Sequence, residues 1–312
     1  MEAKAEAKAI SVSGLTMSYG GHVALVGVGF EVGVGETVAI LGPNGAGKTS
    51  TVEILEGFRR RSGGQVSVLG EDPGEAGRSW RARIGLVLQA TSLDEQLTVR
   101  EELSLYAGMY PNPKPVDEVL DLVGLAGEAD RRIGTLSGGQ QRRVDLGLGI
   151  VGSPELLFLD EPTTGFDPAA RHAAWEAIER LCAGGMTVVL TTHYLEEAER
   201  LADRVVVVAD GRVVADASPG EVGGLAGRGS LVRFPVPEGV GLPANLAADA
   251  TLEDGWATLA TDDLAPVLGE LLDWSREREV DLNRLTVGRP TLEDAYLALT
   301  TGMNTGGSHE GA

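Results

Sequence analysis

A glycine-rich segment at residues 42–50 constrains this chain more than any other stretch of its sequence. The segment fits the pattern G-x-x-x-x-G-K-[ST], and an apolar run at 37–41 precedes it. A helical pattern follows at 51–58. A strand, a glycine-rich turn and a helix in this order can surround phosphate with backbone N–H groups at a helix N-terminus. The segment therefore predicts a phosphate-binding loop made by Gly42, Pro43, Asn44, Gly45, Ala46, Gly47, Lys48, Thr49 and Ser50.

Two side chains of this loop carry chemistry of their own. Lys48 can reach the β- and γ-phosphates of a nucleotide, and the Thr49 hydroxyl can ligate Mg²⁺. The alternative is a glycine-rich turn with a chance lysine, which the flanking strand and helix patterns disfavour. The loop thus predicts a nucleotide-binding enzyme that uses Mg²⁺.

Strand and helix patterns alternate along most of the chain. Apolar runs at 156–159 and 187–191 read as buried strands, and helical patterns follow at 168–182 and 194–202. Such alternation favours a parallel sheet with helices on both faces. A strand pair around Asp210-Gly211 adds antiparallel pairing. We therefore expect an α/β fold of the phosphate-loop nucleoside triphosphatase (P-loop NTPase) class with a mixed sheet core.

The helical patterns and the glycines also divide the chain. Residues 98–125 carry only helical patterns, which predicts an all-helical insert in the α/β chain. A glycine-rich span at 220–229 suggests a boundary. We expect these parts: a flexible lead-in at 1–9, a nucleotide-binding domain at 10–222 with a helical subdomain at about 90–152, a small α+β domain at 230–301, and a flexible tail at 302–312.

Composition limits the partners of the chain. Its 312 residues carry a formal charge of −20 and show no cluster of Lys and Arg, so we expect no nucleic acid partner. The single cysteine, Cys182, excludes an intramolecular disulfide. No run of about 18 apolar residues occurs, which predicts no membrane span. Any role at a membrane would therefore need another chain.

Polar side chains follow several of the expected strands. Asp160 ends an apolar strand, where a carboxylate can help to hold Mg²⁺, and Glu161 could orient and deprotonate water. His193 could hydrogen-bond a γ-phosphate, Gln89 could ligate Mg²⁺ through its amide oxygen, and Tyr19 could stack on a base. Taken alone, each of these has an ordinary alternative: a solvated carboxylate pair, a surface histidine, a strand-end glutamine and a strand aromatic.

Together with the segment Leu136-Ser137-Gly138-Gly139-Gln140, these residues resemble the nucleotide-binding subunit of ATP-binding cassette (ABC) transporters. The resemblance covers residues 10–216 and implies binding and hydrolysis of ATP with Mg²⁺. It implies that Tyr19 is the adenine-stacking aromatic, Gln89 the Mg²⁺-sensing glutamine and Asp160 the Mg²⁺-supporting aspartate. It also implies that Glu161 is the catalytic base, Asp167 the interface aspartate and His193 the switch histidine.

The segment at 136–140 also has a physical reading as an anion site. The Ser137 hydroxyl and the N–H groups of Gly138 and Gly139 stand at an expected helix N-terminus, which suits a γ-phosphate, and Gln140 completes the segment. In the family, that phosphate belongs to ATP held by the opposite subunit. The chain holds one cassette, so the resemblance implies a homodimer or a pair with another ATPase subunit.

The C-terminal segment 289–300 is similar to the ending of bacterial cassettes that serve separate multi-helix membrane subunits, including daunorubicin-type drug exporters. This resemblance implies an exporter, a separately encoded integral membrane permease, and a peripheral place on the cytoplasmic face of the membrane. The permease contact is expected at 89–110, where Leu93, Leu97 and Met109 either receive a permease helix or only fill the helical insert. The chain departs from the family pattern in two places: Gly147 and Gly149 loosen the helix after Gln140, and the segment 164–167 varies the usual interface loop.

Two other classes of function compete with transport. A soluble ABC ATPase that acts on ribosomes or DNA is one, but such chains usually carry two cassettes or basic surfaces, and this chain has neither. A regulatory module that holds ATP without cleaving it is the other, and the presence of Glu161 and His193 argues against it.

Overall fold

Six strands form the central sheet of the structure, a computed structural model that describes residues 8–88, 93–225, 229–237 and 239–301. In spatial order they are β5 (Ile84–Val87), β6 (Leu156–Asp160), β7 (Thr187–Thr191), β3 (Thr37–Leu41), β8 (Arg204–Ala209) and β9 (Arg212–Ala217). Neighbours from β5 to β8 pair in parallel, and β9 returns antiparallel to β8. The α/β fold with a mixed sheet is therefore confirmed.

The central strands are apolar because both faces of the sheet are covered. Every residue of β3 and of β7 is buried. Parallel strands in this situation read as continuous apolar runs rather than as alternating ones. Asp210 and Gly211, which join β8 to β9, both have positive φ. Two such residues in succession match the twist of a two-residue hairpin.

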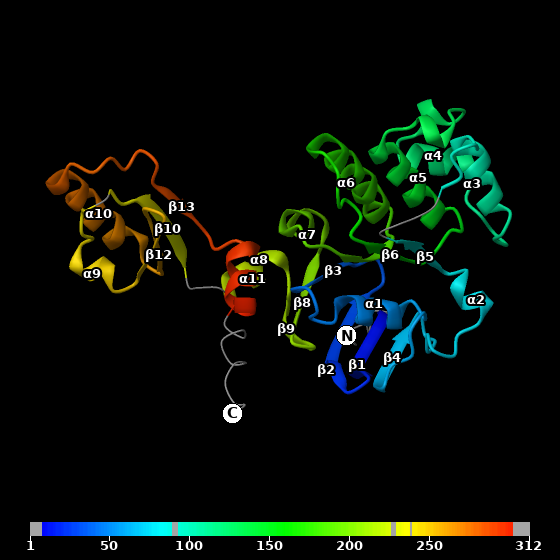
Figure 1. The fold of residues 1–312 in the computed structure, drawn as a ribbon, viewed down its shortest axis with the longest axis horizontal. Coiled ribbons are helices and arrows are strands. Elements are labelled where there is room, and N and C mark those ends of the chain that lie inside the picture. The colour runs from blue at the N-terminus through cyan, green and yellow to red at the C-terminus, as the bar shows by residue number, and fades with distance from the viewer. Residues whose placement is uncertain (1–7, 89–92, 226–228, 238, 302–312) are drawn as a thin grey trace, which may run out of the picture. The chain divides into compact units, whose positions relative to one another are not determined.

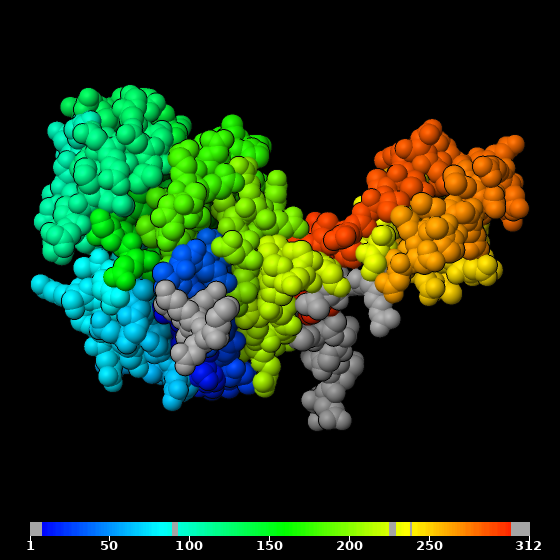
Figure 2. Space-filling model, turned by 180° about the vertical axis from the view of Figure 1, so that it is seen from behind, coloured from blue at the N-terminus to red at the C-terminus, as the bar shows by residue number. Residues whose placement is uncertain are grey.

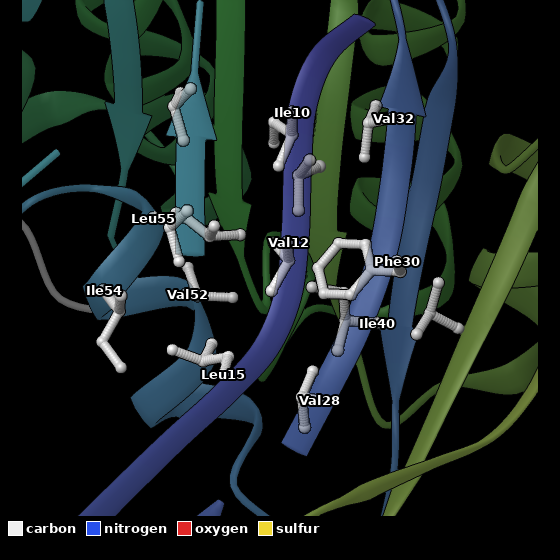
Figure 3. Packing of buried hydrophobic residues seen from close by; sticks show 14 of the residues in the cluster. Ile10, Val12, Leu15, Val28, Phe30, Val32, Ile40, Val52, Ile54 and Leu55 are labelled. Atoms are coloured by element: carbon white, nitrogen blue, oxygen red, sulfur yellow. The ribbon is translucent and has the colours of Figure 1, made fainter. Parts of the chain in front are cut away.

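A second, antiparallel sheet lies beside the phosphate loop. It has the order β2-β1-β4, with β1 (Lys8–Tyr19), β2 (His22–Gly33) and β4 (Gly63–Val68). Helix α1 (Lys48–Leu55) belongs to the same apolar cluster as this sheet and the central one. Figure 3 shows Val52 and Leu55 of α1 pointing toward Val12 and Leu15 of β1. The start of α1 is thus fixed by apolar packing against both sheets.

Helices cover the other face of the central sheet, opposite α1 (Figure 1). They are α5 (Gly138–Ile150), α6 (Pro168–Ala183) and α7 (Leu195–Leu201). Helices α3 (Val99–Ala107) and α4 (Val116–Leu122) pack against α5, and 3₁₀ turns lie at Ala126–Glu128 and Ile133–Thr135. The short α2 (Arg78–Arg81) packs with α1, since its Trp80 belongs to the same apolar cluster. Thr98 and Glu101 form a capping box at the start of α3. The helical patterns expected at 98–125 are confirmed, whereas the helix expected at 51–58 begins and ends three residues earlier.

A second compact unit begins at Gly220. Its sheet has the order β11-β12-β10-β13 and is antiparallel. The elements from the junction onward are α8 (Pro219–Leu225), β10 (Ser230–Pro235), α9 (Ala244–Ala247), β11 (Ala250–Glu253), β12 (Trp256–Thr261), α10 (Leu264–Arg278), β13 (Thr286–Gly288) and α11 (Leu292–Thr301). A separate core that includes Val232, Phe234 and Trp274 holds this unit together.

The structure differs from the sequence-based expectation in several C-terminal places. The second unit begins at Gly220, within the span 220–229 where a boundary was expected, but the helix α8 that runs through the first part of this span was not predicted. The strand expected at 282–287 shortens to β13, because Leu282 and Leu285 close a turn. β11 and α9 were not predicted. The expected lead-in and tail lie mostly outside the described residues. Among residues that are described, no helix has the length and apolar character needed to cross a membrane.

Candidate functional site

The phosphate loop connects β3 to α1, and glycine is required in it. Gly47, the residue before α1, has φ 102°. A Cβ atom there would lie 2.4 Å from the Leu25 side chain. A Cβ atom on Gly42 would lie 2.1 Å from the carbonyl oxygen of Val208. Any larger residue at either position would displace the neighbouring chain, so the loop depends on close backbone packing.

Lys48 is the first residue of α1 and folds back over this loop. Its Nζ atom donates to the carbonyl oxygens of Gly42, at 2.5 Å, and Pro43, at 3.0 Å. Burial lowers the pKa of the Lys48 ammonium, and the carboxylates of Glu161 and Asp160 oppose that effect. The opposing effect is Coulombic, so the loop and the two carboxylates share one electrostatic environment.

Tyr19 lies at the end of β1, beside the start of α1. Its hydroxyl is 2.8 Å from Oγ of Ser50, and the Arg59 guanidinium lies 5.1 Å from the centre of its ring. About a third of the residue is exposed, at 36%. An aromatic ring held at its edge and on one face keeps an orientation that suits stacking on a base.

The carboxyl ends of neighbouring strands bring the other predicted residues together. Asp160 ends β6 and pairs with Thr191, the last residue of β7, which lies beside β3. Oγ1 of Thr191 donates to Oδ1 of Asp160 at 2.5 Å. In α/β sheets, ligands bind at this edge. The phosphate loop, Asp160 and the chain after β7 therefore face one region.

Glu161 and His193 contact each other in this region. Nδ1 of His193 lies 3.5 Å from Oε2 of Glu161, and Thr164 donates its hydroxyl to the same oxygen at 3.1 Å. The Glu161 side chain is 27% exposed and that of His193 is 48% exposed. A half-buried carboxylate next to an imidazole can accept a proton from water and stay oriented while doing so.

The segment 136–140 forms a capped helix start, at α5. Oγ of Ser137 accepts the N–H of Gln140, and the Gln140 side chain accepts the N–H of Ser137. Ser137 and Gly138 are exposed, whereas Gly139 packs against Ala170 of α6. No contact described in the structure joins this segment to the phosphate loop of the same chain, and α5 and α1 lie on opposite faces of the sheet (Figure 1).

The remaining predicted residues have simple surroundings. Thr49, Pro43, Asn44 and Gly45 are exposed, while Ala46 is buried. Asp167 is exposed and caps α6 by accepting the N–H of Ala170 at 3.0 Å. Gln89 lies outside the described residues.

A groove of about 460 Å³ that the sequence did not reveal lies between the end of α1, β5, α3 and α5. Figure 2 shows the surface hollowed between the cyan segment and the green helices. Its lining includes Glu56, Phe58, Leu88, Tyr106, Tyr110 and Asp145. Burial raises the pKa of Glu56 to about 8, and the nearby carboxylates of Asp160 and Glu53 add to this rise. The only signal in the sequence was a glutamate at the end of an amphipathic helix, which usually marks a solvated position.

Two family descriptions match the chain. Residues 25–164 match "ABC transporter", and residues 230–291 match the C-terminal domain of "ABC transporter domain-containing protein-like". The first match contains the phosphate loop, the segment 136–140 and Glu161. The second falls within the second compact unit.

Similar proteins agree with these matches. The chain is 37% identical to the daunorubicin resistance ATP-binding protein DrrA2 of Streptomyces coeruleorubidus, over 94% of this chain and 95% of that protein. It is 43% identical to Nod factor export ATP-binding protein I of a Rhizobium species, strain N33, over 68% of this chain and 71% of that protein. A dimeric ATP-binding cassette in a post-hydrolysis state, bound to ADP and Pi, is 25% identical with a TM-score of 0.58, covering 67% of this chain and 98% of that one.

Proposed function

The chain belongs to the family of ABC transporter ATP-binding subunits, and we propose that it drives an exporter by hydrolysing ATP at Glu161. The family membership makes it an ATPase that uses ATP and Mg²⁺. The names of its relatives support export, since one confers daunorubicin resistance and the other exports Nod factor. The observation that carries the catalytic assignment is the contact between Glu161 and His193 at the strand edge that also holds the phosphate loop.

The residues present fit ATP and Mg²⁺. The close backbone packing at Gly42 and Gly47 leaves no room for a Cβ atom, as a loop that wraps phosphate requires. The hydroxyl of Thr49 and the carboxylate of Asp160 are hard oxygen donors of the kind that Mg²⁺ prefers, and Gln89 would add an amide oxygen. When bound, Mg²⁺ neutralises charge on the phosphates. Lys48 would hold the phosphates, and Tyr19 would stack on adenine.

Within this site, Glu161 would orient and deprotonate the attacking water. The Thr164 hydroxyl and the His193 ring hold its carboxylate from two sides. His193 would hydrogen-bond a γ-phosphate at the same time, which would connect the presence of ATP to the orientation of the base.

The exposed start of α5 supports a dimer. Ser137 presents a hydroxyl and Gly138 an exposed backbone at a helix N-terminus, a place that favours phosphate. Since they lie apart from the phosphate loop of their own chain, we infer that they bind ATP held by a second copy or a paired ATPase subunit. Asp167, at the exposed start of α6, would face the same partner. The dimeric cassette to which the chain is similar supports this arrangement.

The groove supports a contact with a membrane permease. It exposes the large apolar side chains of Phe58, at 65%, and Leu88, at 41%. Met109 is also exposed, at 67%, while Leu93 and Leu97 are half-buried. An apolar groove between packed helices and a strand suits a short helix from a partner. The chain would then sit on the cytoplasmic face of the membrane as a peripheral subunit.

Recovery from membranes tests this proposal. A tagged chain with Glu161→Gln, purified from detergent-solubilised membranes in ATP, should retain an integral membrane protein. The wild-type chain treated with ADP serves as the control. Recovery of ribosomes or DNA in place of a membrane protein would contradict transport and support a soluble ABC ATPase.

A further inference from the structure

Arg142, a residue of α5 to which no role has been assigned above, bonds to the backbone around Glu161. Its Nη2 atom donates to the carbonyl oxygen of Asp160 and its Nε atom to that of Pro162, each at 3.2 Å. Its Nη1 atom donates to the carbonyl oxygen of Leu88. The side chain is only 11% exposed. One guanidinium therefore joins the residue before Glu161, the residue after it and Leu88, which directly follows β5.

The backbone of Glu161 needs such support. Its φ is 45°, in the left-handed region that residues with a Cβ atom disfavour. Such a conformation persists only where surrounding contacts impose it. On the β7 side, the Glu161 N–H donates to the carbonyl oxygen of Thr191 at 3.0 Å. On the α5 side, Arg142 holds the two carbonyl groups that flank Glu161.

We propose that Arg142 is a positioning residue that fixes the turn at Glu161 and so aims its carboxylate at the attacking water. The proposal rests on the role of Glu161 proposed above. A planar guanidinium can bond several fixed acceptors at once, which a lysine cannot do with the same geometry. Without the guanidinium, the turn loses its bonds to α5, and the carboxylate loses its fixed direction.

The same side chain also reaches the groove. Nη1 of Arg142 lies 3.5 Å from Oδ2 of Asp145, and both Asp145 and Leu88 line the groove. Movement of either groove residue would therefore act on the guanidinium that holds the turn at Glu161. Arg142 therefore contacts both the groove and the turn that carries the Glu161 carboxylate.

Steady-state ATPase kinetics of the purified full chain test the proposal. Arg142→Ala should lower kcat about tenfold or more and leave KM for ATP within about twofold, because a small misplacement of a reacting group costs rate rather than affinity. Arg142→Lys should retain an intermediate kcat. Arg143→Ala is the matched control, since Arg143 lies on the same helix but donates to the carbonyl oxygens of Gly124 and Val123. It should keep kcat within about twofold of wild type.

A double variant separates positioning from folding. Arg142→Ala with Glu161→Gln should bind ATP as tightly as Glu161→Gln alone and show the same residual rate, because Arg142 acts only through Glu161. A wild-type kcat for Arg142→Ala would overturn the proposal. A double variant that binds ATP more weakly than Glu161→Gln, by the same factor as the fall in kcat of Arg142→Ala, would also overturn it. Normal hydrolysis by Glu161→Gln would instead refute the function proposed for the site.

Discussion

Glu161 lies where two kinds of constraint meet, a left-handed backbone and a side chain held by Thr164 and His193. Replacement by Gln keeps the shape and the Thr164 bond but removes the base. We expect Glu161→Gln to lower kcat by about 10²-fold or more, the range typical of a lost general base. ATP binding should remain. Phosphate release and chromatography in ATP measure both effects, and a trapped ATP-bound dimer is the expected form.

Glu56 predicts a pH dependence of stability. Burial raises its pKa in the folded chain to about 8, above the 4.5 of an unperturbed glutamate. The folded state therefore binds more protons than the unfolded state between pH 4.5 and 8, and the stability of the wild-type chain falls as pH rises through that window. Glu56→Gln removes the titration. Its free energy of unfolding, relative to wild type, should increase by up to about 1.4 kcal/mol per pH unit across the window.

Urea unfolding at pH 5, 6.5 and 8 checks this expectation. Glu118→Gln, at a position whose side chain is 52% exposed on α4, is the matched control, and its difference from wild type should change by less than about 1 kcal/mol. A constant difference between Glu56→Gln and wild type would show that Glu56 is ionised in the folded chain at every pH tested.

At the scale of elements, the sequence predicts those parts whose local pattern and tertiary role agree. Continuous apolar runs predicted β3, β6 and β7, and the residues at their ends carry the proposed chemistry. Patterns failed where long-range contacts decide the outcome. The glycines at 220–229 gave no sign of the helix α8, although the chain does divide into two units at Gly220, and a turn at Leu282 shortens β13. The left-handed turn at Glu161 and the bonds of Arg142 depend on residues distant in sequence, so no local pattern could reveal them.

Two neighbouring glycines at the start of α5 should differ in their effects. A Cβ atom on Gly139 would lie 2.7 Å from that of Ala170, so Gly139→Ala must separate α5 from α6. It should cost about 1–3 kcal/mol of stability. Nothing lies within 4 Å of a Cβ on Gly138, so Gly138→Ala should keep the thermal midpoint while lowering ATPase activity by blocking the proposed phosphate contact. Thermal unfolding and ATPase assays of both variants test this, and equal losses of stability would contradict it.

At the scale of the whole molecule, each of the two compact units has its own core and its own family match. One core joins α1 to both sheets of the first unit, and the other lies within residues 232–280. The first family match, at residues 25–164, lies within the first unit, and the second, at residues 230–291, lies within the second unit. The proposed ATP site, however, is incomplete in one copy, because Lys48 and Ser137 lie on elements that cover opposite faces of the sheet. The functional molecule is therefore expected to be a pair of chains.

Complementation between two inactive variants tests that expectation. Lys48→Ala removes the phosphate contact of the loop, and Gly138→Ala blocks the start of α5, so each homodimer has both sites broken. A mixed dimer instead joins the intact loop of one chain to the intact α5 start of the other, which restores one site of two. Since half of a random mixture is mixed dimers, activity should reach about a quarter of wild type. The Lys48→Ala chain, assayed alone, is the control for residual turnover. An activity of the mixture no higher than the sum of the activities of the two separate variants would place the whole site within one chain.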